Sequence, residues 1–207
     1  MKYSYITKLA NAFYALANKE DSKSYFLKEI SKLDTYKARI ELAEKNFKHL
    51  SSGSSRIVYL TDDNTVIKLA KNDKGIDQNK AEASIVTKSP LINNIIKCDK
   101  DNIWIEVDYL KKITATEFED MTSINFKDFD EVLSYDFKTG KKPKKPKNFE
   151  EITENIFYKK VKDICKKFNL VYGDVGRISS WGTKNKLPVL IDTGLTNEVH
   201  KKHYKSS

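Results

Sequence analysis

Residues 51–70 read SSGSSRIVYLTDDNTVIKLA, and this segment determines the type of fold that we expect for the chain. Residues 56–60 and 65–70 are rich in β-branched and aromatic side chains, which favour strands. Thr61-Asp62-Asp63-Asn64 between them supplies turn-forming residues. We therefore predict a β-hairpin that is entered through the polar, Ser/Gly-rich stretch 51–55.

The segments around this hairpin extend it to a small α+β unit. A helix is predicted over residues 77–88, where Pro90 ends it, and strands are predicted over residues 92–97 and 103–107. Residues 50–110 thus have the order β-β-α-β-β. Before them, the apolar spacing predicts a helix over residues 6–17 and a longer amphipathic helix over residues 26–47. We interpret both as a packing extension, because their apolar seam is too short for a coiled coil.

The remainder of the chain, residues 111–207, is mainly helical by the same criteria. Thr114 and Glu117 have the spacing of a capping box, and a short helix follows around residues 126–133. A further helix, capped by Asn148 and Glu151, buries apolar residues as far as Phe168. The end of the chain returns to strands and turns, over residues 170–172 and 188–194.

Composition limits the possible classes of protein. With 207 residues, 39% hydrophobic and 11% aromatic, the chain can bury a core, and it has no apolar run near the roughly 20 residues that span a membrane. No secretion signal is indicated. Cys98 and Cys165 lack metal-ligand spacing and indicate buried or inert thiols of a reducing compartment. We therefore expect a cytoplasmic protein.

The net charge of +9 is weak evidence for nucleic-acid binding. Only Arg39, Arg56 and Arg177 are arginines, whereas recognition of nucleic acid relies on arginine for bidentate contacts. A solvated, lysine-coated surface is the better interpretation. The same applies to the basic loop Lys138–Lys147, for which contact with nucleic acid or an acidic partner stays open as the alternative.

Several charged residues follow one another in an order that suits phosphoryl transfer. Lys68 lies within a predicted strand, and Glu82 lies on the helix that follows it. A lysine in a strand centre is costly to bury unless a carboxylate partners it, and Glu82 can supply one. Asp174 follows a helix and a strand, and Asp192 ends the apolar run Val189-Leu190-Ile191. Phosphoryl transfer needs positive charge on the phosphates, one carboxylate for Mg²⁺ and another for the attacking hydroxyl.

In this order the chain resembles the protein-kinase-like superfamily, which includes the aminoglycoside phosphotransferases, and it looks closest to small kinase-like proteins of bacteriophages. The resemblance implies an α+β, truncated protein-kinase-like fold, with a small antiparallel sheet and a helical lobe. Its parts would be an N-terminal helical extension (1–49), an N-lobe (50–110) and a truncated helical C-lobe (111–207).

The resemblance also implies roles for single residues. Gly53 and Ser54 belong to a segment similar to the glycine-rich loop and would lie at the phosphates of ATP, while Trp104 to Leu110 would border its base. Val66-Ile67-Lys68 resembles the Val-Ala-Ile-Lys strand, so that Lys68, anchored by Glu82, would bind the α- and β-phosphates. Tyr172-Gly173-Asp174 stands in the place of His-Arg-Asp or His-Gly-Asp, which makes Asp174 the candidate base. Asp192-Thr193-Gly194 resembles Asp-Phe-Gly, which makes Asp192 the candidate Mg²⁺ ligand.

Three departures from the pattern weaken the case for catalysis. Ser179 stands five residues after Asp174, where the family carries an asparagine as second metal ligand, and serine is a poorer ligand. Ser51 and Arg56 replace two glycines of the loop. The chain also ends soon after Asp192, without the later helices that bind a peptide substrate, so that we expect a small acceptor or vestigial catalysis.

The sequence thus predicts a minimal kinase-like protein that binds Mg·ATP and transfers phosphate to an unidentified acceptor. An inactive, pseudokinase-like binding protein or virion protein is the alternative, and a lysine-driven nucleic-acid binder is a weaker one. If the protein is encoded by a phage, it would act in the host cytoplasm or the virion.

Some nearby residues have a simpler interpretation. Trp181 is expected to pack in the core rather than stack on a ligand. Arg177 could bind an anion or neutralise Asp174. His49, His200 and His203 lack metal spacing, and we expect them to be solvated.

Overall fold

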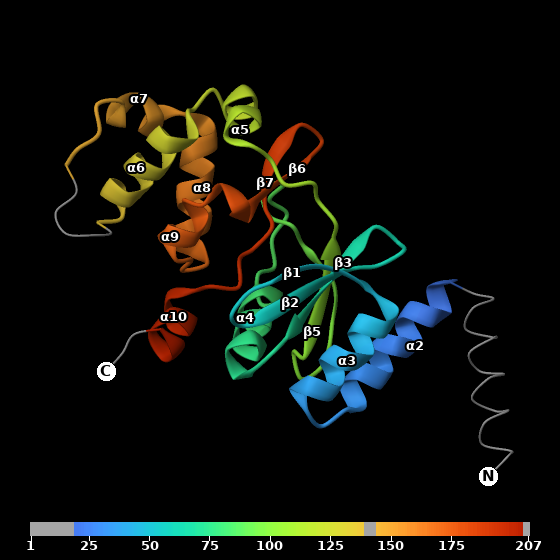
Figure 1. Ribbon diagram of the computed structural model, residues 1–207. Coiled ribbons are helices and arrows are strands. Elements are labelled where there is room, and N and C mark those ends of the chain that lie inside the picture. Colours follow the sequence, from blue (N-terminus) through green and yellow to red (C-terminus); the bar gives the residue numbers. More distant parts are fainter. Residues whose placement is uncertain (1–18, 139–143, 205–207) are drawn as a thin grey trace, which may run out of the picture. The chain divides into compact units, whose positions relative to one another are not determined.

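The predicted hairpin forms part of a five-stranded sheet with the strand order β1-β2-β3-β5-β4 (Figure 1). The computed structural model describes residues 19–138 and 144–204, and in them the α+β class is confirmed. The strands are β1 (Lys48–Ser52), β2 (Arg56–Leu60), β3 (Thr65–Ala70), β4 (Ile95–Cys98) and β5 (Trp104–Asp108). The pairs β1–β2, β2–β3 and β3–β5 are antiparallel.

Strand β1 differs from the prediction of a loop over residues 51–55. Ser51 pairs with Val58 and Ser52 pairs with Ile57, so that the loop shrinks to a short turn after Ser52. All five residues of β1 are exposed. An edge strand without a buried face shows no alternation of apolar and polar residues, and this explains why the sequence did not reveal it.

The described chain divides into two compact units. The first contains residues up to Ile76 together with Lys97–Tyr109, and the second contains Asp77–Ile96 together with the residues from Leu110 onward. The predicted helix over residues 6–17 lies outside the described residues, and the predicted division at residues 49/50 and 110/111 stays a prediction.

In the first unit, two helices pack on one face of the sheet. They are α2 (Lys19–Lys32) and α3 (Tyr36–Asn46), where the sequence predicted one helix over residues 26–47. The break occurs because the Thr35 hydroxyl accepts a hydrogen bond from the Ala38 N–H (3.2 Å) and so starts a new helix. The core between helices and sheet is formed by Leu27, Ile30, Ala43, Ile57, Tyr59, Ile67, Leu69, Ile103 and Trp104.

Helix α4 (Asp73–Ala83) begins and ends several residues before the predicted range of 77–88. Its early start is explained by Asn72, whose side chain accepts a hydrogen bond from the Gly75 N–H (3.2 Å) at the first turn. The capping box at Thr114 and Glu117 is confirmed, and it opens α5 (Ala115–Thr122). Helix α6 (Phe126–Asp136) follows.

The predicted helix capped by Asn148 is in fact two helices, α7 (Phe149–Glu154) and α8 (Ile156–Lys167). Asn155 separates them and caps α8, because its side chain accepts a hydrogen bond from the Phe157 N–H (2.8 Å). Asn148 makes no side-chain cap and instead donates a hydrogen bond to Asp128 (2.8 Å).

The end of the chain contains one hairpin and two helical segments. Residues 170–172 were predicted as a strand, but Leu170 forms only an isolated bridge with Thr196, and α9 (Tyr172–Val175) begins directly after it. A turn of 3₁₀ helix, η1 (Ile178–Ser180), leads into the hairpin of β6 (Trp181–Lys184) and β7 (Leu187–Leu190). Helix α10 (Asn197–His203) follows.

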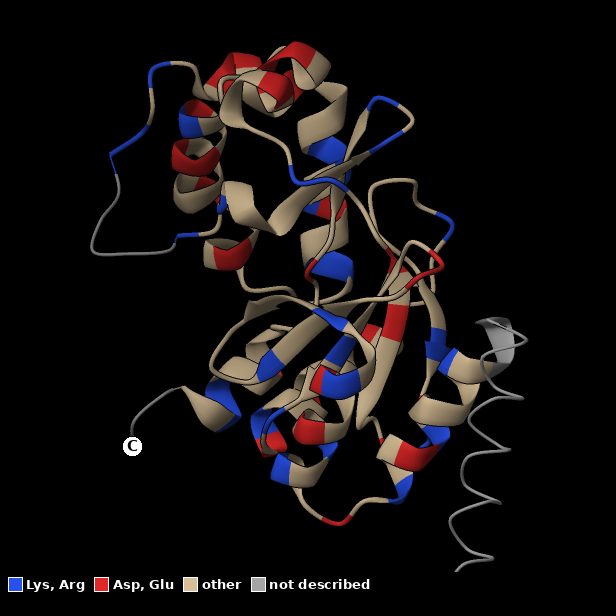
Figure 2. Cartoon of the chain, turned by 45° about the vertical axis from the view of Figure 1, so that its right-hand side comes forward, with Lys and Arg blue, Asp and Glu red and all other residues tan. Residues whose placement is uncertain are grey.

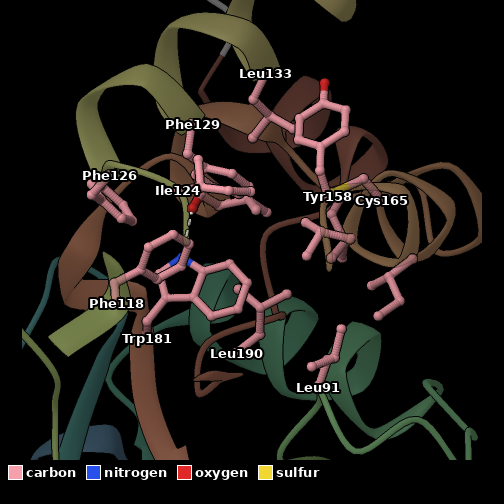
Figure 3. Close-up of a cluster of buried hydrophobic side chains, with 14 of the residues drawn as sticks. Leu91, Phe118, Ile124, Phe126, Phe129, Leu133, Tyr158, Cys165, Trp181 and Leu190 are labelled. Carbon is pink, nitrogen blue, oxygen red and sulfur yellow. Dashed lines mark hydrogen bonds between the residues drawn. The ribbon is translucent and has the colours of Figure 1, made fainter. Parts of the chain in front are cut away.

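Trp181 lies at the centre of the second unit's core (Figure 3). It is 0% exposed, and its ring lies 5.6 Å from Phe118 and 6.1 Å from Phe129, both centroid to centroid. The expectation that Trp181 packs is thus confirmed. Cys165 lies in the same core, and burial raises the pKa of its thiol to about 12, so that it is unreactive at neutral pH.

Candidate functional site

Lys68 lies in the middle of the sheet of the first unit. It pairs with Val58 on β2 and with Ile105 on β5, and it is only 5% exposed. Ile67 and Leu69 on either side of it enter the core beneath α2 and α3. Because neighbouring side chains of a strand point to opposite faces, Lys68 lies on the face turned away from that core. The sheet thus carries a buried lysine at its centre, between apolar residues of the two neighbouring strands.

The turn with Gly53 and Ser54 is fastened to the end of β3. Inside the hairpin, the Gly53 N–H donates to the Arg56 carbonyl (2.9 Å). The Lys71 ammonium donates to the Gly53 carbonyl (2.9 Å), and the Asn72 amide donates to the Ser54 carbonyl (2.9 Å). Both turn residues are exposed. The turn is therefore fixed to Lys71 and Asn72, which follow Lys68 closely in sequence.

Glu82 lies on α4 and is 2% exposed. It belongs to the second unit, whereas Lys68 belongs to the first. The pairing of Glu82 with Lys68 therefore stays a prediction.

Ser179 and Asp192 lie at the base of the β6–β7 hairpin. Trp181 pairs with Leu190, and the Ile191 N–H donates to the Ser180 carbonyl (2.9 Å), which extends the ladder by one pair. Ser179 precedes Ser180 within η1, and Asp192 directly follows Ile191. The two residues predicted to bind metal therefore each lie next to a residue of the hydrogen bond between Ile191 and Ser180, and both are exposed.

The turn that carries Asp174 is attached to the same hairpin. The Trp181 indole N–H donates to the Val175 carbonyl (2.8 Å), next to Asp174 in sequence. On the other side, the Val171 N–H donates to the carbonyl of Leu195 (3.0 Å), shortly after Asp192. One hydrogen-bonded framework in the second unit thus holds the segments of Asp174, Ser179 and Asp192 side by side.

Arg177 pairs with Asp174, since its guanidinium Nη1 lies 3.0 Å from Asp174 Oδ1. Of the two roles that the sequence left open, the structure therefore shows the ion pair with Asp174. Asp192 Oδ1 accepts a weak hydrogen bond from the Gly194 N–H (3.4 Å).

The donors at the hairpin base suit Mg²⁺ bound through a nucleotide. In residues 19–138 and 144–204, no three His, Cys, Asp or Glu side chains gather as a complete protein metal site would require. Mg²⁺ at nucleotide sites takes one or two carboxylates and completes its shell with water and phosphate oxygens. One exposed carboxylate at Asp192 and one exposed hydroxyl at Ser179, on neighbouring segments, fit that second arrangement.

An ion-pair cluster joins α4 and α10, and nothing in the sequence indicated it. His203, which we expected to be solvated, is 14% exposed, and its Nε2 lies 2.5 Å from Asp77 Oδ2. Lys202 binds the same oxygen (2.6 Å). These residues are more than a hundred positions apart, and no local pattern reports such a contact.

No protein-family model and no curated protein matches this sequence. Among solved structures, the chain is similar to those of aminoglycoside phosphotransferases. The ternary complex of streptomycin, ATP and APH(2″)-IIa is 16% identical, with a TM-score of 0.34 over 78% of this chain and 71% of that chain. ADP-bound APH(2″)-Ib is 14% identical, with a TM-score of 0.34 over 75% and 69%. The gentamicin complex of APH(2″)-IIa is 16% identical, with a TM-score of 0.36 over 79% and 70%.

No helix within the described ranges is long and apolar enough to span a membrane.

Proposed function

We propose that this chain binds ATP with Mg²⁺ and transfers the terminal phosphate to an acceptor still to be identified, as the small phage kinase-like proteins that it resembles would. The observation that carries the proposal is the framework around Trp181, which holds the segments of Asp174, Ser179 and Asp192 side by side. A carboxylate for metal and a second one for a hydroxyl are the protein groups that phosphoryl transfer requires.

Lys68 supplies the positive charge for the phosphates in this proposal. Its place at the centre of a sheet supports the role, because a strand interior fixes a side chain better than a loop does and a buried ammonium interacts strongly with an anion. The turn of Gly53 and Ser54 would contact the phosphates through its backbone, and Glu82 would orient the lysine.

Asp192 would hold Mg²⁺, assisted by the Ser179 hydroxyl. The ion neutralises charge that builds up on the phosphate oxygens during transfer. Asp174 would accept the proton of the acceptor hydroxyl while the oxygen of that hydroxyl forms a bond to the γ-phosphorus. The bond from that phosphorus to the β,γ-bridging oxygen then breaks, and ADP leaves.

The test is the thermal stability of the full chain with Mg·ATP. At about a hundred times its Kd, a ligand stabilises the native state by roughly 2.7 kcal/mol. We expect this shift in the parent and its loss in Lys68→Met and Asp192→Asn. Lys48→Met on exposed β1 and Asp163→Asn on the exposed face of α8 are matched controls that keep it. A folded parent with no shift at millimolar Mg·ATP contradicts the proposal.

Ser179→Asn extends the same test with a variant that should bind Mg·ATP more tightly than the parent. Asparagine restores an amide oxygen where the related enzymes have one, and Mg²⁺ accepts such oxygens as ligands. We expect Mg·ATP to bind several-fold more tightly, while ATP without Mg²⁺ binds as before. An equal change under both conditions would show that residue 179 acts independently of the metal.

The ion pair of Arg177 with Asp174 favours a second candidate, a nucleotide-binding protein that does not transfer phosphate. A carboxylate held 3.0 Å from a guanidinium is stabilised in its charged form and is a weaker base. Phosphate release or transfer in the same Mg·ATP samples separates the two candidates. Binding without turnover supports the second one.

A further inference from the structure

Helix α10 is joined to α4 by three side-chain contacts. Asp77 on α4 lies 2.6 Å from the Lys202 ammonium and 2.5 Å from His203 Nε2. One residue further along α4, the Gln78 amide donates to the Tyr204 hydroxyl (3.3 Å). All five residues belong to the second unit. The contacts cross more than a hundred positions of sequence and fix α10 against one side of α4.

Glu82 lies on the side of α4 that contacts α10 and the residue after it. Gln78 and Glu82 are four residues apart, so that they lie above one another on the same helix face. Both are buried, at 7% and 2% exposed. A slip of α4 by one residue would rotate this face by about 100°. Contacts at Asp77 and Gln78 therefore fix the direction in which Glu82 points.

The other end of α10 is tied to the segment before Asp174. The Asn197 N–H donates to the Asn169 carbonyl (2.8 Å), and its side-chain amide donates to Asn169 Oδ1 (2.8 Å). Thr196 forms a bridge with Leu170. The start of α10 also follows Asp192 within a few residues, so that this end is fixed next to both candidate carboxylates.

From these contacts we propose that α10 is a strut that sets the position of Glu82 relative to Asp174 and Asp192. Asp77, Gln78, Lys202, His203 and Tyr204 are then positioning residues, which act through α4 and contact no substrate. This inference rests on the proposed function, because it assigns Glu82 a role at the nucleotide site.

The electrostatics at Asp77 agree with a permanent connection. Burial acts to raise the pKa of the Asp77 carboxyl, but hydrogen bonds from Lys202 and His203 outweigh it and lower the pKa below its ordinary 3.8. Asp77 thus stays ionised at neutral and mildly acidic pH. The Lys202 contact also persists whichever charge His203 carries.

The test combines nucleotide affinity with hydrogen exchange of the α4 amides in the full-length chain. Asp77→Asn removes the charge with little change of shape. Glu154→Gln is the control, because it breaks the exposed pair with Lys159 without touching α4 or α10. The pair Asp77→Lys with Lys202→Asp reverses the charges and tests whether the contact itself matters.

We expect Asp77→Asn to weaken Mg·ATP binding roughly three- to tenfold and to speed exchange in α4, since a partly buried ion pair holds the helix. The control leaves both unchanged, and the charge-reversed double variant recovers a large part of both. Unchanged affinity and exchange in Asp77→Asn overturn the proposal.

Failure of the proposed function gives a different result. If the parent does not bind Mg·ATP, that function falls, and hydrogen exchange alone decides whether α10 holds α4. Faster exchange of α4 in Asp77→Asn but not in Glu154→Gln then supports the strut. Equal exchange in both variants overturns it.

Discussion

At the level of single residues, Glu106 shows how this chain accommodates a buried charge. It lies on β5, is 2% exposed, and accepts hydrogen bonds from the Lys23 ammonium (2.6 Å) and the Thr65 hydroxyl (2.7 Å). Lys23 also reaches Asp63 (2.7 Å). The cluster ties α2 to the sheet in the first unit, and it is structural rather than catalytic.

Lys23→Met should destabilise the protein by about 3 kcal/mol, because it leaves the Glu106 carboxylate buried without its cation. The matched control on the same helix is Lys32→Met, which breaks only the exposed pair with Glu29 and should cost far less stability. Urea unfolding measures both free energies. Equal losses would show that the Lys23 pair is no more than a surface contact.

The stabilising effect of Lys23 should depend on pH in one direction. Burial lowers the pKa of Lys23, but hydrogen bonds from its ammonium to Asp63 and Glu106 together outweigh burial and raise the pKa above 10.5. A raised lysine pKa stabilises the fold fully below the unfolded value and loses that effect as pH rises through the folded value. The difference between parent and Lys23→Met should therefore be constant near neutrality and shrink above about pH 10.5.

The sequence predicted candidate site residues, and these stay predictions, but it did not reveal most of the contacts between distant residues. Lys68, Asp174 and Asp192 stand out because a charge beside an apolar run is unusual. The pair of Asp174 and Arg177 was open to prediction, since the residues are three positions apart. Lys23 with Glu106 and Asp77 with His203 join residues 83 and 126 positions apart, and only the folded chain brings those together.

At the level of elements, the start of α4 meets the β1–β2 turn through Gly75. A Cβ at residue 75 would lie 2.2 Å from the Ser55 carbonyl oxygen and 2.9 Å from the Ala70 Cα. Both neighbours are backbone atoms, which cannot turn aside as a side chain can. The absence of a side chain at Gly75 is therefore what lets the helix begin so close to the turn.

Gly75→Ala should consequently destabilise the first unit by about 2 kcal/mol or more, as overpacking does. Gly53→Ala is the control, because a Cβ there would meet nothing nearer than the Arg56 carbonyl oxygen at 3.8 Å. Thermal unfolding should show a large loss in the first variant and almost none in the second. If Gly53→Ala weakens Mg·ATP binding but leaves the melting temperature unchanged, the added methyl group hinders the approach of the ligand and does not disturb the fold.

Elements were predictable where a short-range pattern defined them. The β2–β3 hairpin and the capping box of α5 both follow from a few neighbouring residues. The breaks at Thr35 and Asn155 were missed because the apolar spacing continues across them. A Thr or Asn in such a pattern can occupy an exposed position within a helix or can cap the start of a new one. The structure shows the cap in both cases, because Thr35 accepts a hydrogen bond from the Ala38 N–H and Asn155 accepts one from the Phe157 N–H.

At the level of the whole molecule, basic and acidic residues alternate along the helices of the described residues. Figure 2 shows Lys and Arg interspersed with Asp and Glu along the helices. Lysines pair with carboxylates at several such places, including Lys127 with Glu131 and Lys162 with Asp136. In the part of the chain that the structure describes, many lysines thus lie beside carboxylates.

The two units have separate hydrophobic cores, and each contains one tryptophan. Trp104 belongs to the core of the first unit and Trp181 to that of the second, and no residue belongs to both. The chain contains only these two tryptophans. The fluorescence of Trp104→Phe therefore reports the second unit, and that of Trp181→Phe reports the first.

This arrangement predicts that the two units respond separately to a core substitution. Leu27→Ala, in the core of the first unit, should cost about 2–5 kcal/mol, and Phe129→Ala, in the core of the second, about 3–5 kcal/mol. Each core substitution is made in both the Trp104→Phe and the Trp181→Phe protein, and urea unfolding is followed by fluorescence. Each should lower the urea midpoint reported by the tryptophan of its own unit. The midpoint reported by the tryptophan of the other unit should stay unchanged within error. If either substitution shifts both midpoints equally, the chain unfolds as one cooperative unit despite its two cores.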